Sequence, residues 1–552
     1  MSFQLLLLAE PLIATGLSRW LATDRPDLTV VEASETLNGP PALVLWRPSS
    51  GTPLEVLQRE VTLLRERWQP APLLLVLGHG HGLPPADLLL LSSEGVLEDP
   101  APSQLLAALD TLLQGGRVME LQGQAGDRDD ANRRLGPNLG QALLLGGLQQ
   151  IDVAATGCQL LLSRPSIHPL ARLMLQGRLR ELAWARRLLL WLWGPLSLAW
   201  ADTPADDSSG SQSPTRAHSS GISSGTSLTL QQRNASGVWQ AVQQRLTSAI
   251  EAGLANHSGQ LLALEGLSGQ RRIDLLIALI NQLDALRGQL VEELGQNPGD
   301  PASQLLQRWR ALQPRLREQA LLAMASPYVQ LPLEGQLRLV AARLVEASDL
   351  ESDDPELPDA QAMLTTLVMA RPLLVEGQLL PADEPRAVLH LERLVANWLL
   401  RSAELLAADV LACCGDWPEL RRYLLRPELL STRNLERLRN QLNAQQRWLS
   451  WFERPVALYE SRRQLLCLEA GGIACHNLLE PRDQELRRLG WLQQLVTLAL
   501  ETRDALAPQL RQLIRGFGDL VVVLLTQVVG RAIGLVGRGI LQGMGRSLGR
   551  PS

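Results

Sequence analysis

The chain has 552 residues, enough for roughly two to four domains, and its 45% apolar and 20% charged residues are typical of globular proteins. The net charge is −5, which excludes a global basic field for binding nucleic acid. All 52 basic residues are arginine. The absence of lysine excludes a Walker-type phosphate lysine and a Schiff-base lysine.

The first part of the chain alternates short apolar runs with helical patterns. The predicted strands cover residues 3–8, 29–31, 42–46, 73–77 and 95–97. Helical spacing is expected over residues 12–22, 53–68 and 102–114, and the last of these ends before Gly115-Gly116. This alternation predicts a doubly wound, parallel α/β domain over residues 1–120.

The remainder of the chain is predicted to be mostly α-helical. We expect a helical segment over residues 137–200 and an α-helical domain over residues 237–552. Residues 201–236 are rich in Ser, Gly, Thr and Pro, so we expect a disordered linker or insertion there. No uncharged apolar run of about 20 residues occurs, and no basic stretch precedes the first apolar run, so we expect a cytoplasmic protein.

Two segments of the first domain resemble the receiver domains of two-component response regulators. The segment LLLLAEPLIATGLSRWL at 5–21 is similar to the first strand and helix of NarL-type receivers. The segment GVLEDPAPSQLLAALDTLLQGGRVM at 95–119 is similar to the fifth strand and the closing helix. The resemblance covers residues 1–120 and implies a flavodoxin-like fold.

The residues that receiver chemistry requires are replaced in this sequence. Receivers hold Mg²⁺ with acids after the first strand, carry an aspartate nucleophile after the third, and pair a lysine after the fifth with the phosphate. Here the first strand offers Glu10 alone, and the third ends at Arg47 without a carboxylate. Glu98 and Asp99 stand near the place of the lysine. We therefore predict a pseudo-receiver that cannot be phosphorylated, with these acids beside an emptied cleft.

No catalytic, cofactor or metal site is predicted from the remaining patterns. His79 and His81 lie in a glycine-rich loop without a third ligand nearby in the sequence. Cys467 and Cys475 lack the spacing of a zinc knuckle, and we expect packed thiols. No compact basic recognition helix follows the first domain, so no nucleic-acid partner is expected.

Two C-terminal segments resemble a family of conserved hypothetical proteins of cyanobacteria and red-algal plastids, of the ycf type. The segments are NLERLRNQLNAQQRWLSWFERPVALYESRRQLL (434–466) and DLVVVLLTQVVGRAIGLVGRGILQGMGRSLGR (519–550). The family has no established reaction. The resemblance implies a cyanobacterial cytoplasm or a plastid stroma, close to thylakoids.

The C-terminal tail is the clearest candidate for binding a membrane or a partner. No acidic residue follows Asp519, and the candidate residues are Arg531, Arg538, Arg546 and Arg550. Glycines recur at four-residue spacing, which lets helices approach closely. Three interpretations stay open: a helical hairpin of the core, an oligomerisation surface, or a basic amphipathic segment on anionic lipid.

We expect a non-catalytic regulatory or scaffold protein that uses the pseudo-receiver and the helical domain for protein–protein interaction. It would need no cofactor, and its protein partner is unknown. One alternative is a peripheral thylakoid-associated assembly factor bound through its tail. Another is an enzyme whose site lies in the helical domain and is not visible in the sequence; a deep polar pocket with converging carboxylates would favour that alternative.

Overall fold

The computed structural model describes residues 3–121 and 226–505, apart from short gaps at 33–36, 38, 50, 79–80, 297–300, 334, 470 and 503. The chain divides into two compact units. The first holds residues 1–442 with 464–476, and the second holds residues 443–463 with those from 477 on. The predicted helical segment 137–200 and the candidate residues Arg531, Arg538, Arg546 and Arg550 lie outside the described residues.

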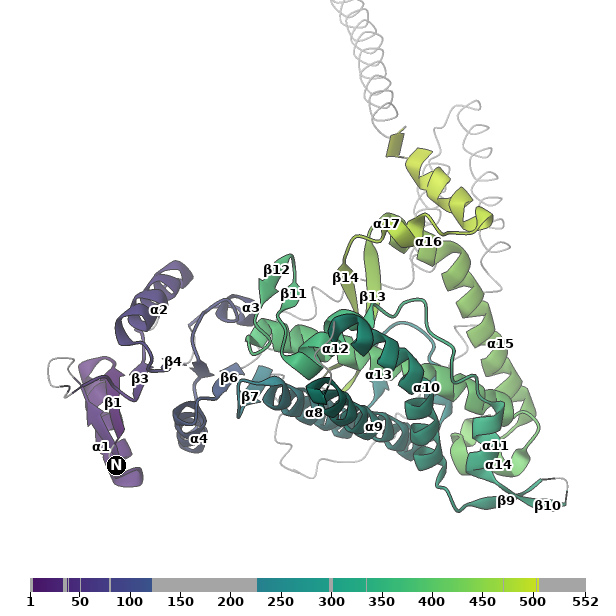
Figure 1. The fold of residues 1–552 in the computed structure, drawn as a ribbon, viewed down its shortest axis with the longest axis horizontal. Helices are drawn as coiled ribbons and strands as arrows, with labels where there is room; N and C mark the ends of the chain where they lie inside the picture. Colours follow the sequence, from purple (N-terminus) through teal and green to yellow (C-terminus); the bar gives the residue numbers. More distant parts are fainter. Residues whose placement is uncertain are drawn as a thin grey trace, which may run out of the picture. The chain divides into compact units, whose positions relative to one another are not determined.

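A seven-stranded sheet opens the first unit, with the strand order β2-β1-β3-β4-β5-β6-β7 (Figure 1). The strands are β1 (Phe3–Leu8), β2 (Leu28–Val31), β3 (Leu43–Trp46), β4 (Leu73–Leu77), β5 (Gly95–Glu98), β6 (Arg117–Leu121) and β7 (Thr226–Leu230). Neighbouring strands from β2 to β6 pair in parallel. Strand β7 pairs antiparallel to β6. The expected parallel α/β domain is therefore present.

Helices pack against both faces of this sheet. They are α1 (Pro11–Asp24), α2 (Leu54–Trp68), α3 (Pro85–Leu88) and α4 (Pro102–Leu113). Leu5 and Leu7 of β1 pack in one core with Leu21 of α1 and Leu109 of α4. Leu6, which points to the other face, belongs to the cluster that includes Val61 of α2. Because both faces are covered, the strands are continuous apolar runs, and that made them readable in the sequence.

The last two strands of the sheet were not predicted. The linker or insertion expected over residues 201–236 is wrong at its C-terminal end, because β7 forms there and α8 (Ala235–Ala252) begins there. Leu228 and Leu230 of β7 are buried and alternate with Ser227 and Thr229. This period of two was hidden in a segment rich in Ser and Thr.

The rest of the first unit is mostly helical, as expected, and is built around a long buried helix, α13 (Pro385–Cys413) (Figure 1). Buried residues line α13 from Pro385 to Leu411. The surrounding helices are α8, α9 (Gly269–Gln296), α10 (Pro301–Ala325), α11 (Val340–Ala347) and α12 (Ala360–Met369). Two further helices follow it, α14 (Pro418–Leu424) and α15 (Thr432–Trp448).

Three β-hairpins interrupt the helical region and were not predicted. They are β9 (Gln330–Leu333) with β10 (Gln336–Leu339), β11 (Leu373–Val375) with β12 (Gln378–Leu380), and β13 (Arg462–Glu469) with β14 (Gly472–Leu479), which also pairs with β8 (Ala255–Asn256). Gly335, Gly377 and Gly471 stand at the three turns with φ values of 81°, 81° and 92°. Glycine reaches this left-handed region without strain, so these glycines were the signal that the helical interpretation overlooked.

The second unit contains a π-helical turn over Leu449–Glu453, α16 (Arg454–Tyr459), α17 (Asp483–Leu486) and a helix over 491–502. The buried side chains of Arg463 and Arg482 converge on Glu485, at 2.7 Å and 2.8 Å. Within the described ranges, no helix combines the length and the apolar character needed to cross a bilayer.

Candidate functional site

The first candidate site is the edge of the sheet where β1, β3, β4 and β5 end. In parallel sheets, ligands bind at the carboxyl ends of the strands. Glu10 follows β1 and is exposed, and Arg47 follows β3. A Cβ atom placed on Gly78, which follows β4, would lie 3.3 Å from Arg47 Nη2. The Arg47 guanidinium, which comes from the end of β3, therefore lies against the end of β4.

Acidic residues end the neighbouring strand β5. Glu98 is its last residue, and its Oε1 atom lies 2.9 Å from Nε2 of His81. The two side chains are 14% and 8% exposed, so this pair is largely removed from water. Asp99 follows in a left-handed conformation, with φ of 44°, and its N–H donates to Leu77 O at 2.9 Å.

His81 has both ring nitrogens occupied by contacts with the protein. Its Nδ1 atom accepts the backbone N–H of Leu83 at 3.0 Å, so Nε2 carries the proton of the neutral ring. Nε2 is within ion-pair distance of Glu98, although it is not aligned for a hydrogen bond. His79 lies outside the described residues. Across the part of the chain that the structure describes, no three His, Cys, Asp or Glu side chains are grouped to hold a metal ion.

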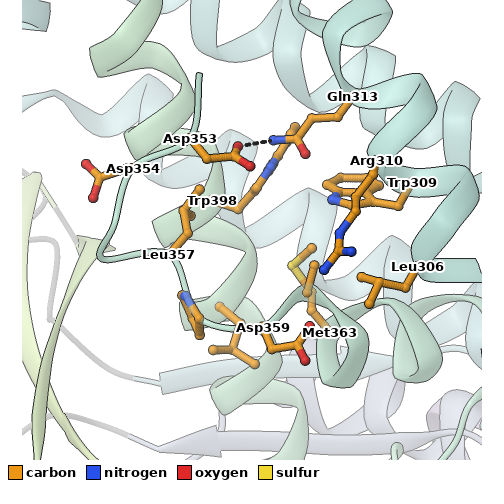
Figure 2. A pocket seen from close by; sticks show the side chains of 13 residues that line it. Leu306, Trp309, Arg310, Gln313, Asp353, Asp354, Leu357, Asp359, Met363 and Trp398 are labelled. Carbon is orange, nitrogen blue, oxygen red and sulfur yellow. Dashed lines mark hydrogen bonds between the residues drawn. The ribbon is translucent and has the colours of Figure 1, made fainter. Parts of the chain in front are cut away.

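The second candidate site is a cavity of about 300 Å³ in the helical part of the first unit (Figure 2). It is bordered by α10, α12, α13 and the loop before α12. Trp309 of α10 and Trp398 of α13 meet edge to face, with ring centroids 5.2 Å apart and planes at 61°. Leu306 and Met363 add apolar wall.

Three carboxylates stand around this cavity, and each has a partner within the protein. Asp353 accepts from Arg317 and from Gln313, both at 3.1 Å. Asp354 pairs with Arg401 at 3.3 Å. Asp359 caps α12, because its Oδ1 atom accepts the N–H of Gln361 at 3.0 Å. These carboxylates fix the loop and the helix end.

Arg317 of α10 anchors the loop before α12 through several hydrogen bonds. Its side chain is 1% exposed, and besides Asp353 it donates to the carbonyls of Leu350 and Ser352. Burial lowers the pKa of Arg317, and the charge of Asp353 opposes that shift. Sequence reasoning missed the cavity because its residues come from four separate elements and show no local pattern.

Other buried titratable groups lie in the core of the helical part. Glu404 of α13 accepts the backbone N–H groups of Ala263 and Leu264 at 2.7 and 2.8 Å, and burial raises its pKa to about 7. Cys414 and Cys467 are buried, and burial raises the pKa of Cys467 to about 12. Both thiols are packed in the core, as expected for Cys467, and a thiol with so high a pKa is a poor nucleophile.

Two segments match family models. Residues 138–193 match the helical hairpin domain of cyanobacterial response regulators. Residues 354–545 match a protein family of unknown function, DUF3685. The first match falls on the segment expected to be helical, and the second begins in the loop that borders the cavity.

Three relatives connect the chain to cyanobacteria and red algae. A Ycf55-like protein of Synechocystis sp. is 29% identical over 419 residues, which are 73% of this chain and 71% of the relative. The uncharacterized protein ycf55 of Pyropia yezoensis is 28% identical over 136 residues, 24% of this chain and 42% of the relative. That of Porphyra purpurea is 33% identical over 100 residues, 18% of this chain and 31% of the relative.

No solved structure matches the chain significantly. The resemblance read from the two C-terminal segments is nevertheless confirmed. The chain is homologous to the Ycf55-like proteins of cyanobacteria and the ycf55 proteins of red-algal plastids, and it includes a segment related to the helical hairpin of cyanobacterial response regulators.

Proposed function

We propose that the chain is a non-catalytic regulatory or scaffold protein whose N-terminal domain is a receiver without phosphorylation chemistry. The order β2-β1-β3-β4-β5 is that of flavodoxin-like sheets, and it supports the receiver-like assignment. The match of residues 138–193 to a response-regulator hairpin supports it independently. The observation that carries the proposal is the position of Arg47. This residue follows β3, and its guanidinium lies against Gly78, which follows β4.

An arginine at this position cannot form an aspartyl phosphate, because it has no carboxylate to accept the phosphoryl group. The reaction needs a carboxylate nucleophile after β3 and a basic partner after β5 for the phosphoryl oxygens. Here β3 is followed by Arg47, and β5 ends at Glu98. The charges at the two strand ends are thus the reverse of those in a working receiver, and a phosphoryl group would meet the repulsion of Glu98 and Asp99.

Polar contacts connect the sheet to the helical region, as a scaffold requires. Arg117 at the start of β6 is 5% exposed, and its Nη1 atom donates to Glu384 at 2.9 Å, next to the first residue of α13. Arg233, in the turn after β7, pairs with Asp383 at 2.6 Å. A partner that binds the sheet or the helical region would therefore affect both, because these contacts join them. Regulation would come from binding equilibria alone.

Incubation with acetyl phosphate and Mg²⁺, followed by intact mass measurement, tests this proposal. We expect no added phosphate on the full chain, whereas a receiver with its aspartate in place, treated in parallel, gains one. A stable phosphoryl adduct mapped to residues 1–120 would contradict the proposal. Affinity purification from the native source would then identify the protein partner.

The thylakoid-associated alternative rests on a different observation. Two of the relatives are ycf55 proteins of red algae, and we infer a plastid or cyanobacterial setting in which thylakoids are close. The arginines of the tail, from Arg531 to Arg550, would supply the contact with anionic lipid. Flotation with anionic liposomes, with and without residues 517–552, tests it, because equal binding of both forms would remove the tail from any membrane role.

A further inference from the structure

The cavity between α10, α12 and α13 has hydrogen-bond donors that lack partners. Arg310 of α10 lines it, and no carboxylate among the described residues lies within ion-pair distance of its guanidinium. Figure 2 shows this guanidinium directed into the cavity, toward Met363. Trp398 is 3% exposed, and its indole N–H is buried without a hydrogen-bond partner in the described structure. An unpaired buried donor is costly, and it indicates that something absent from the protein itself completes the site.

Each carboxylate of the same cavity already has a partner within the protein. Asp353 and Asp354 are neutralised by Arg317 and Arg401. Asp359 accepts from the first turn of α12, where the helix dipole also favours a negative charge. A ligand that brought further donors would therefore compete with these contacts, whereas a ligand that brings acceptors would meet Arg310 and the indole N–H.

We propose that this cavity binds a small organic acid with a flat, apolar body. The carboxylate pairs with the Arg310 guanidinium and accepts from the Trp398 N–H. The body packs on Trp309, Leu306 and Met363. A volume of about 300 Å³ is at the lower end of the range for small-molecule pockets, so the ligand is of the size of a substituted aromatic acid. This inference does not depend on the proposed function.

A water molecule in the cavity would satisfy fewer of these groups than an organic acid. A water molecule could accept from the Trp398 N–H, but it brings no negative charge to the exposed Arg310 guanidinium. A carboxylate pairs with this guanidinium through charge-assisted hydrogen bonds, and an aromatic body covers the part of Leu306 that is not buried.

Titration calorimetry with three probes of one shape tests the inference on the full chain. The probes are benzoate, its uncharged amide benzamide, and the cation benzylamine. We expect saturable binding of benzoate, and binding of the other two that is weaker by about tenfold or more, the loss expected when a charge-assisted hydrogen bond is removed. Benzylamine binding as tight as benzoate would show that the rim acids select a cation, and it would overturn the inference.

Two variants and a matched control locate the binding. Arg310→Gln removes the charge from an exposed position, so the fold is preserved and benzoate affinity should fall about tenfold. Trp398→Phe keeps an aromatic ring in the cavity wall but removes the N–H together with the five-membered ring that carries it, and it should weaken benzoate several-fold. Arg315→Gln, exposed on the same helix but outside the cavity lining, should bind like the unchanged chain. Unchanged benzoate affinity in Arg310→Gln, or no benzoate binding up to about 10 mM, weaker than any specific site of this kind, overturns the inference.

Discussion

Leu121 and Thr226 are partners across the antiparallel β6–β7 ladder, although residues 122–225 separate them in the chain. The intervening segment therefore leaves the edge of the sheet and returns to it at one place. Residues 138–193 of that segment match the response-regulator hairpin. We predict that residues 122–225 can be replaced by an Asn-Gly turn, because the strands are already in hairpin register. Circular dichroism should show the remaining helices retained, with a thermal midpoint within a few degrees of the full chain.

A longer deletion provides the control. Removing residues 122–230 also removes β7, whose Leu228 and Leu230 are 2% and 0% exposed. Their loss should cost roughly 2 kcal/mol or more for each buried leucine, and the thermal midpoint should drop clearly below that of the shorter deletion. If both deletions melt together, β7 is not part of the folded sheet.

The first domain could be predicted from the sequence because burial on both faces makes its strands continuous. Residues 3–8 and 73–77 were predicted with the bounds that the structure gives them, because leucine fills positions 5–8 and leucine and valine fill positions 73–77. Strand β6 was missed because it begins with the charged Arg117, whose side chain is buried by its pairing with Glu384. Its partner Glu384 is more than two hundred residues away in the chain, so no local sequence pattern could predict that Arg117 is buried in a strand.

The candidate sites differ in the same way. The lack of a carboxylate directly after β3 could be read from Trp46-Arg47, because a strand end and the residue after it are adjacent in sequence. The position of the Arg47 guanidinium against Gly78 needed the fold. The cavity needed it even more, since Trp309 and Trp398 meet only when α10 packs near α13.

Arg117 should stabilise the contact between the sheet and α13. In Arg117→Leu, the Glu384 carboxylate, which is 21% exposed, and the Asp383 carbonyl lose their donor. We expect a loss of about 2–3 kcal/mol in the free energy of unfolding, because a largely buried charge is left without its partner. Urea unfolding followed by circular dichroism measures it. Arg343→Leu, which breaks an exposed pair with Glu346, should leave the free energy of unfolding almost unchanged.

Arg317 should be essential for the loop that borders the cavity. Arg317→Met keeps the length of the side chain but leaves the carbonyls of Leu350 and Ser352 and the Asp353 carboxylate without this donor. We expect a loss of roughly 2–4 kcal/mol and faster proteolysis near residues 349–359. Limited proteolysis with mass mapping measures the second effect. Cleavage that is unchanged at this loop would mean that Arg317 contributes to packing alone.

Glu404 should make the stability of the chain depend on pH. Its pKa in the folded protein is about 7, raised by burial from an ordinary value of 4.5, and the backbone N–H groups of Ala263 and Leu264 only partly offset this shift. Between these two values the folded chain holds a proton that the unfolded chain has released. The contribution of Glu404 to stability is therefore greatest below pH 4.5, falls as the pH rises toward 7, and changes no further above it.

Comparison with Glu404→Gln isolates this effect, because glutamine resembles the protonated acid and does not titrate. From pH 4.5 to pH 7.5, the free energy of unfolding of the unchanged chain should fall relative to Glu404→Gln by up to about 3 kcal/mol, given a shift of the size stated for Glu404. Urea unfolding at several pH values measures the difference. Glu251→Gln, a surface substitution on α8, should run parallel to the unchanged chain at every pH. Parallel curves for Glu404→Gln as well would mean that the carboxylate is ionised in the fold, stabilised by its two N–H donors and by Arg401 more strongly than burial opposes it.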